Sequence, residues 1–254
     1  IAVVGLGNRG QLFAEYVLDS ADAELTAIAD CNESAREKAQ NEYKLAPQNC
    51  YESADEFFAQ GKCADAVFSC TQDSDHKAHT IKAMQLGYDV CLEKPIATKM
   101  QDCEDIYAAQ QATGRKVMIC HVLRYSHFYG KLRQMIKSGE IGDVVTIRYW
   151  HDAHSYVRGV WSNAEKSSPM ILAKCCHDLD ILFWLYGKRC KSVSSFGGLY
   201  YFKKENAPEG AAAYCVDCNP DTRKDCPYDA FKIYNDIYKA YNPILGNATV
   251  FRTS

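Results

Sequence analysis

A glycine-rich turn near the start of the chain has the composition of a phosphate-binding loop. Gly5, Gly7 and Gly10 form the pattern GxGxxG, with Asn8 and Arg9 between the last two glycines. The first glycine permits a tight turn, the second lets main chain approach a pyrophosphate, and the third lets helix and strand pack closely. A helix that follows offers free amides and a positive dipole end to phosphate. Because the pattern follows an apolar, strand-like run, it predicts a dinucleotide site rather than a glycine turn that binds nothing.

Asp30 ends a second apolar run, at the position where dinucleotide-binding folds carry an acidic residue. A carboxylate there accepts hydrogen bonds from both hydroxyls of an adenine ribose and repels a 2′-phosphate. We therefore predict NAD as the cofactor and NADP as the less favoured one. Arg9 could pair with a phosphate, which is the argument for NADP.

Glu93, Lys94 and Pro95 close the apolar run YDVCLE (88–93) and begin a turn. In an open parallel sheet, ligands bind outside the carboxyl ends of the strands. A lysine at such an end can orient a hydroxyl or ketone oxygen, and it can transfer a proton if its pKa is lowered. The plainer interpretation is a lysine paired with Glu93 at the start of a loop. Pro95 stiffens the turn and is a candidate for a cis peptide bond.

The segment 169–186 predicts a helix that carries a second titratable group. Lys174, His177 and Asp178 share one helix face, and Asp180 lies one turn after His177. A histidine beside a carboxylate can hold a defined tautomer and exchange a proton near neutral pH. The alternative is a helix face of solvated charges.

The elements that must position these groups alternate through the first half of the chain. We expect strands at 1–5, 24–30, near 50–51, 64–70, 88–93 and 116–122. Helices are expected at 9–19, at 32–43 and at 99–113, with one more that begins at residue 53 and another that follows the fourth strand and ends at residue 86. Strands that are apolar throughout and joined by helices predict a parallel sheet covered on both faces. The fold class is therefore α/β, with a Rossmann doubly wound parallel sheet in residues 1–122.

The pattern changes after about residue 122. A helix is expected over 128–138, and DVVTIRYWHD (143–152) and KSVSSFGGLYYF (191–202) are expected to be strands. We therefore predict a second, α+β domain over 123–254 with a mainly antiparallel sheet and a cysteine-rich insertion around 203–229. The chain begins inside an apolar run without an initiator Met and ends soon after VFR. We expect it to be part of a longer protein.

Several stretches resemble the Gfo/Idh/MocA oxidoreductases, the family of glucose-fructose oxidoreductase and inositol dehydrogenase. They are AVVGLGNRG, AIAD, Thr71 to His76, GYDVCLEKPIA, LRYSHFYGKLRQMIKSGEIGDV and CHDLDILFWLYG, all within residues 1–187. The resemblance implies that Lys94 lies beside the nicotinamide and contacts the substrate, with Glu93 and Pro95 in the same site. It also implies that His177 is the catalytic acid–base group. The family's second domain often forms dimers through an open sheet, which implies a homo-oligomer.

The resemblance extends the cofactor site and the substrate border to residues further along the chain. It assigns Thr71, His76 and Arg124 to the cofactor, and Tyr125 to the border between cofactor and substrate. Gln72 and Asp73 replace the usual Pro-Asn after the threonine, so we expect contacts on the nicotinamide side to differ. His127 stands where a proline is usual, and we interpret it as a cap or surface residue.

One departure from the family's pattern bears directly on the reaction. The family has an aspartate four residues before its catalytic histidine, whereas this chain has Ala173 there and Lys174 next to it. The usual Asp–His–Lys proton relay is therefore in question. Lys174 is a candidate to bind a substrate hydroxyl or carboxylate, and Asp178 or Asp180 is a candidate to orient His177.

Thirteen cysteines are present, most of them single within apolar runs, as for Cys70, Cys91 and Cys120. We interpret them as free thiols in a reducing, cytoplasmic protein. Three others form the cluster Cys215, Cys218 and Cys226. A zinc site there would need a fourth ligand, such as Cys190 or a histidine. The alternatives are free thiols or an oxidisable pair, and we assign no metal.

Composition excludes several classes of protein. The chain has 254 residues, 47% hydrophobic, and a net charge of −3. It is long enough to bury one large core or two modest ones, which excludes a disordered chain. No basic run is dense enough to suggest nucleic acid, and the apolar stretches are too short to span a membrane.

The favoured function is NAD-dependent oxidation of a secondary alcohol in a sugar, cyclitol or related polyol. Hydride would pass between the substrate carbon and C4 of the nicotinamide, with Lys94 and His177 as catalytic residues. Tyr125, Lys174 and Trp161 are candidate substrate contacts, although Trp161 could equally belong to the core. One alternative is an enzyme that uses held NAD transiently to eliminate a glycosidic substituent without net redox change. Another is a non-catalytic NAD-binding sensor.

Overall fold

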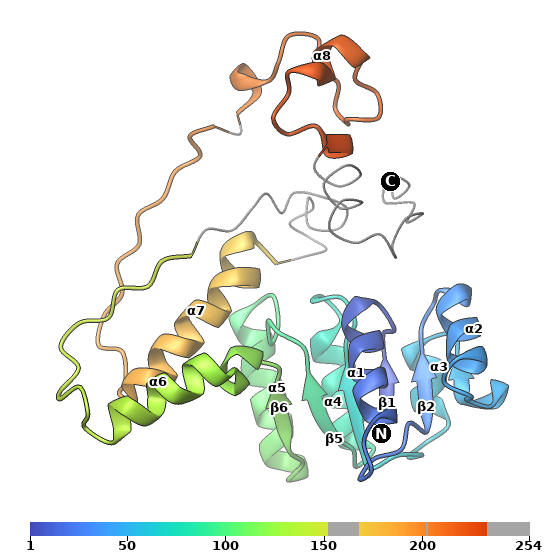
Figure 1. The fold of residues 1–254 in the computed structure, drawn as a ribbon. Helices are drawn as coiled ribbons and strands as arrows, with labels where there is room; N and C mark the ends of the chain where they lie inside the picture. The colour runs from blue at the N-terminus through green and yellow to red at the C-terminus, as the bar shows by residue number, and fades with distance from the viewer. Residues whose placement is uncertain (152–167, 202, 233–254) are drawn as a thin grey trace. The chain divides into compact units, whose positions relative to one another are not determined.

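Residues 1–151, 168–201 and 203–232 are described by a computed structural model. The chain divides into two compact units, Ile1–Arg189 and Cys190–Ser254. The first unit contains a parallel sheet with helices around it (Figure 1).

Six short parallel strands form the sheet of the first unit. They are β1 (Ala2–Val4), β2 (Ala27–Ala29), β3 (Cys50–Tyr51), β4 (Ala66–Ser69), β5 (Asp89–Leu92) and β6 (Val117–Ile119). Their order in the sheet is β3-β2-β1-β4-β5-β6, and every neighbouring pair is parallel. This is the predicted Rossmann order, in which the chain reverses direction across the sheet between β1 and β4. Ligands in such sheets bind at the carboxyl ends of the strands near that reversal.

Helices cover both faces of the sheet, because its strands are apolar on both sides. The helices of this domain are α1 (Asn8–Leu18), α2 (Glu33–Asn41), α3 (Ala54–Ala59), α4 (His76–Gln85) and α5 (Met100–Thr113). One apolar cluster joins the sheet to α1 and α2 through Val17 and Ala39, and another joins it to α3, α4 and α5 through Phe57, Met84 and Ile106. As predicted, the side chain of Asn32 caps α2 by accepting from the main-chain amide of Ser34.

Two further helices follow the last strand of the sheet. A 3-10 turn, η2 (Val122–Tyr125), leads into α6 (His127–Lys137), and α7 spans Met170–Tyr186. Both helices contact η2 and each other. The guanidinium carbon of Arg133 on α6 lies 4.1 Å from the centre of the Trp184 ring on α7, so the two helices pack directly. His127 is exposed at the start of α6, and Ser126 is the cap, which agrees with the surface interpretation of His127.

The prediction of two strands in the second half of the chain is wrong for the residues that the structure describes. The segments 143–151 and 191–201 have no strand assignment there. Val145 is 91% exposed and Phe196 is 96% exposed. An alternating pattern marks which side chains would be buried, but a strand also requires a neighbour whose amides and carbonyls complete the ladder. Neither segment pairs with the six described strands, so the predicted antiparallel sheet is not formed in this part of the chain.

The described residues of the second unit include the short helical segments η4 (Lys204–Asn206) and α8 (Pro220–Lys224). The thiol of Cys215 points to the Tyr228 carbonyl, and the Cys218 sulfur accepts from the Ala212 amide. Among the described residues, no group of three or more possible ligands could hold a metal ion. The predicted division of the chain at residue 122 stays a prediction.

None of the thirteen cysteines is joined in a disulfide. Cys91 and Cys120 are buried at adjacent strands with their sulfurs 3.3 Å apart, whereas Cys70 is half-buried. Within the described residues, no helix combines the length and the apolar character needed to cross a bilayer.

Candidate functional site

The glycine turn between β1 and α1 has a shape that only glycine permits at two positions. Gly5 has φ +88°, and a Cβ there would lie 2.6 Å from the carbonyl oxygen of Cys70. A Cβ on Gly10 would lie 1.9 Å from the carbonyl oxygen of Gly5. Both contacts are with main chain, which cannot move aside. These two glycines therefore let the turn press against β4 and against the first turn of α1.

Gly7 differs from the other two glycines because a Cβ there would meet nothing within 4 Å. It precedes α1 as the N-cap residue, and no side chain caps that helix. An uncapped helix end beside open space offers its amides to a ligand phosphate. The turn therefore fits the pyrophosphate of a dinucleotide.

Arg9 is engaged by the protein itself. Its Nε donates to Glu93 Oε1 at 2.7 Å, and its guanidinium carbon lies 4.9 Å from the centre of the Phe13 ring. The Glu93 side chain is only 7% exposed, whereas that of Arg9 is 42% exposed. The pair joins the start of α1 to the end of β5, so Arg9 helps to neutralise a buried carboxylate beside the glycine turn.

Asp30 lies beside the same turn, at the end of β2. Its two carboxylate oxygens accept from the main-chain amides of Leu6 at 2.5 Å and Asn32 at 2.7 Å. The Arg36 guanidinium donates to the main-chain carbonyl of Asp30 at 2.9 Å. Each carboxylate oxygen retains acceptor capacity, so Asp30 can still receive ribose hydroxyls. The carboxylate is oriented by the turn that would hold the pyrophosphate.

Glu93, Lys94 and Pro95 follow β5, where the peptide bond between Lys94 and Pro95 is cis. Glu93 pairs with Arg9, and Lys94 Nζ instead donates to the main-chain carbonyl of Ala173 on α7 at 3.2 Å. The plainer interpretation of Lys94, a lysine paired with Glu93, is therefore wrong. Lys94 joins the edge of the sheet to the helix that carries His177.

Thr71 and His76 stabilise the loops around this edge. His76 is fully buried, with Nδ1 2.8 Å from the Pro95 carbonyl and Nε2 3.3 Å from the Thr71 carbonyl. The Thr71 hydroxyl lies 3.1 Å from His79 Nδ1. The contacts that the structure records for His76 join the ends of β4 and β5. Binding of the cofactor by Thr71 and His76 stays a prediction.

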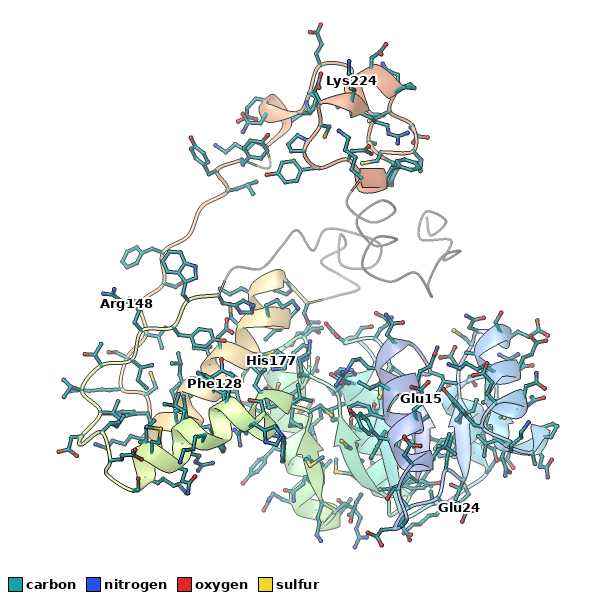
Figure 2. The ribbon with its side chains drawn as sticks, in the orientation of Figure 1. Glu15, Glu24, Phe128, Arg148, His177 and Lys224 are labelled. Carbon is teal, nitrogen blue, oxygen red and sulfur yellow. The ribbon has the colours of Figure 1, made fainter. Side chains whose placement is uncertain are left out.

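His177 lies on α7 one turn after Ala173 (Figure 2). Burial, together with the positive charge of Lys94, lowers the pKa of His177 to about 4. The imidazole is therefore neutral at pH 7 and able to accept a proton. Its Nδ1 is buried and has no hydrogen-bond partner in the described part of the chain.

Neither carboxylate that the sequence offered for orienting His177 does so. Asp178 pairs with His151, Oδ1 to Nδ1 at 2.8 Å. Asp180 receives two donors from Arg124, Nε at 2.7 Å and Nη2. The prediction that Asp178 or Asp180 orients His177 is therefore wrong for the described contacts. Helical spacing places these carboxylates near His177 along the chain, but each points to a partner on another segment.

His121 is a member of the site that the sequence analysis missed. It follows β6, and the centre of its ring lies 5.9 Å from that of His177, at an interplanar angle of 84°. Its Nε2 is 3.9 Å from Asp180 Oδ1. Burial lowers the pKa of His121 as well. The available signal was its place at the carboxyl end of a predicted strand, three residues before Arg124.

The proposed substrate contacts receive uneven support. Tyr125 is 74% exposed, and its hydroxyl lies 3.9 Å from the sulfur of Met118. Lys174 is half-buried, and its positive charge contributes to the low pKa of His177. Trp161 lies outside the described residues. Contact of any of these side chains with a substrate stays a prediction.

Two family models match the chain. The model described as "Oxidoreductase family, NAD-binding Rossmann fold" matches residues 1–121, and the Gfo/Idh/MocA C-terminal domain matches 129–216. The first of these models describes the Rossmann domain as NAD-binding, as the glycine turn and Asp30 predict.

Curated relatives match at low identity. The chain is 26% identical over 245 residues to "Putative oxidoreductase YteT" of Bacillus subtilis, which covers 90% of this chain and 56% of the relative. It is 27% identical to an inositol 2-dehydrogenase/D-chiro-inositol 3-dehydrogenase of Shouchella clausii, over 76% of this chain and 54% of the relative. The chain thus spans about half the length of the curated relatives it matches.

Among solved structures, scyllo-inositol dehydrogenase from Lactobacillus casei with bound NAD(H) and scyllo-inositol has a TM-score of 0.62 and 24% identity. That match covers 73% of this chain and 55% of the other. At this identity, the similarity establishes the fold.

Proposed function

The chain belongs to the Gfo/Idh/MocA family of oxidoreductases, and we propose that it is an NAD-dependent dehydrogenase of a secondary alcohol in a sugar, cyclitol or related polyol. The observation that carries this proposal is the hydrogen bond between Lys94 and helix α7. The lysine ammonium binds the Ala173 carbonyl one helical turn before His177, at the carboxyl end of β5. At that edge, an ammonium group can orient a substrate hydroxyl and a neutral imidazole can accept its proton as the alcohol is oxidised.

The glycine turn and Asp30 are the residues that would hold the cofactor. Bound NAD⁺ supplies the hydride acceptor, at C4 of its nicotinamide. The amides at the start of α1 hold the pyrophosphate, and the Asp30 carboxylate accepts from the adenine ribose. Because Asp30 would repel a 2′-phosphate, the proposed preference is for NAD over NADP.

Lys94 and His177 then handle the substrate hydroxyl. The Lys94 ammonium donates to the hydroxyl oxygen and stabilises the negative charge that develops on it as the proton leaves. His177, neutral at pH 7, receives that proton at Nε2, because its Nδ1 is buried. In the reverse direction, the same imidazole returns the proton to the carbonyl oxygen.

A panel of sugars, cyclitols and other polyols, each with NAD and with NADP, tests the function by nicotinamide absorbance. We expect reduction of NAD with at least one polyol, and loss of most of it in the His177→Gln variant, which keeps the side chain polar and near its size. If all candidates are inert with both cofactors, while the protein binds NAD, the dehydrogenase proposal fails.

A second candidate is an enzyme that uses NAD transiently and gives no net redox change. Two observations favour considering it: the chain has Ala173 in place of an aspartate, and a relative at 26% identity over 77% of the chain is the 2,7-anhydro-N-acetylneuraminate hydratase of Escherichia coli K12. Elimination of a glycosidic substituent in the presence of NAD, without accumulation of free NADH, would support it. Stoichiometric NADH would contradict it.

A further inference from the structure

His121 has no role in the reaction proposed above, yet it is the side chain whose ring lies against His177. The two ring centres are 5.9 Å apart at 84°, so the edge of one ring meets the face of the other. In the part of the chain that the structure describes, Nδ1 of each imidazole is buried without a hydrogen-bond partner. Buried polar atoms without a partner are rare in folded proteins and call for an explanation.

The position of His121 is set by α7 itself. Asp180 lies one turn after His177 on that helix, and its Oδ1 is 3.9 Å from His121 Nε2. The Arg124 guanidinium, only three residues after His121, holds the same carboxylate with two donors. The Asp180 side chain is 10% exposed and that of Arg124 is 40% exposed, so the carboxylate is the shielded partner of this ion pair. The pair therefore locks the segment that carries His121 onto the helix that carries His177.

We propose that His121 is a positioning residue for His177: its ring closes the buried side of the His177 imidazole and leaves Nε2 as the nitrogen that meets the substrate. The inference rests on the proposed dehydrogenase function for its consequence in turnover. The physical reason is the cost of burying a charged ring. Nε2 can accept a proton only when Nδ1 carries the hydrogen of the neutral imidazole, and a ring protonated on both nitrogens would lack hydration on its Nδ1 side. His121 thus keeps His177 neutral by excluding water from Nδ1.

The other charges that act on His177 come from two elements. Lys94 and Glu93 follow β5, with opposite effects on a protonated ring, and Lys174 lies on α7 one turn before His177. Asp178, the next residue along α7, is paired with His151. A substitution at His121 leaves these groups in place but also removes the repulsion between the two imidazoles. His121→Phe and His121→Ala share that loss, so the difference between the two variants isolates the ring contact.

Three variants test the proposal by NMR titration of the His177 imidazole from pH 8 to pH 5, with His177→Gln used to assign its signal. His121→Phe keeps a ring of similar shape against His177. His121→Ala opens the space to water. His127→Ala removes an exposed histidine at the start of α6 and is the matched control.

We expect His177 to remain neutral across this range in the parent, in His121→Phe and in the control. In His121→Ala, its pKa should rise by about one unit or more toward its ordinary value, because water reaches Nδ1. In turnover, His121→Ala should lower kcat about tenfold or more, with KM for NAD within about twofold, since a misplaced acid–base group loses most of its contribution of about 10²–10⁴. The control should keep the parent's kcat.

An unchanged His177 titration in His121→Ala would overturn the proposal, and so would a pKa that rises equally in His121→Phe. The titration needs neither cofactor nor substrate. A protein that oxidises no polyol but shows the expected titrations would therefore refute the proposed function and leave the positioning role standing.

Discussion

The ammonium group of Lys94 and the main-chain carbonyl of Ala173 are joined by a hydrogen bond of 3.2 Å. The Gfo/Idh/MocA pattern predicts an aspartate at position 173, whereas this chain has Ala173, whose main-chain carbonyl accepts from Lys94. A carbonyl carries no net charge, so the lysine keeps its full positive charge toward His177, and this charge lowers the pKa of the imidazole. Because position 173 offers Lys94 a main-chain carbonyl and no carboxylate, the uncompensated charge of Lys94 helps to keep His177 neutral.

The role of Lys94 can be measured by replacing it with methionine. Lys94→Met keeps an unbranched side chain but removes the charge that stabilises the developing oxyanion. We expect kcat to fall by about 10²–10⁴, while the Kd for NAD, measured by calorimetry, stays within about threefold. Lys94→Arg is the control, because it retains a cation with different geometry, and it should recover only part of the loss. Equal turnover in the parent and Lys94→Met would remove Lys94 from the mechanism.

Gly7 and Gly10 provide a matched pair that separates binding from folding. Alanine at Gly7 meets open space, so Gly7→Ala should fold with a Tm within about 2 °C of the parent. Its methyl group would occupy the space where the pyrophosphate approaches, and we expect the Kd for NAD to rise about tenfold or more. Gly10→Ala places a Cβ 1.9 Å from a main-chain oxygen and should lower Tm by at least about 5 °C. Thermal unfolding and calorimetry on both variants check this, and a Gly7→Ala protein with parental affinity would contradict the proposed cradle.

Asp30 is expected to set the choice of cofactor. Asp30→Asn keeps the shape and one acceptor oxygen but loses the charge that repels a 2′-phosphate. We expect the Kd for NAD to rise about tenfold, the effect of losing roughly 1.4 kcal/mol, and the NAD:NADP affinity ratio to narrow. Asp30→Ala also removes the acceptors of the Leu6 and Asn32 amides, so it should in addition lower Tm. The expectation fails if the Asp30→Asn variant has the parent's ratio of the two Kd values.

Acid should destabilise the fold through its buried histidines. The pKa of His177 is about 4 in the folded protein, below the 6.5 of an ordinary imidazole, and the pKa values of His79 and His121 are also lowered. The unfolded chain therefore takes up protons first as pH falls. The stabilisation from a neutral His177 is complete above pH 6.5 and is lost as pH falls toward 4.

Urea unfolding of the parent and of His177→Gln between pH 7 and pH 4.5 measures this effect. The parent's free energy of unfolding should fall more steeply than the variant's, by at most about 1.4 kcal/mol per pH unit. His79 and His121 are present in both proteins, so the difference between the two slopes belongs to His177. Parallel slopes would mean that His177 titrates alike in the folded and unfolded chains.

The Rossmann part of the fold could be predicted from local pattern because each of its elements carries a local signal. Asn32 caps its helix, apolar runs form each strand, and the glycine spacing of the first turn is imposed by contacts within a few residues or with the adjacent strand. The strands expected at 143–152 and 191–202 are not formed in the described residues of those segments, 143–151 and 191–201, for a different reason. A strand is completed by a partner that can lie far along the chain, and alternation alone does not specify that partner.

Residue types and their spacing predicted the dinucleotide turn and the carboxylate of Asp30, because these signals are local in the chain. The roles of Lys94 and His177 were predicted from the resemblance to the Gfo/Idh/MocA family. Which groups meet was decided by packing between segments that are distant in sequence. In the folded protein Arg9 donates to Glu93, Lys94 donates to the Ala173 carbonyl, and Arg124 donates to Asp180. It also brings His121 against His177. A long charged side chain can reach several neighbouring groups. The arrangement of the strand ends beside α7 therefore determines which hydrogen bond each side chain forms.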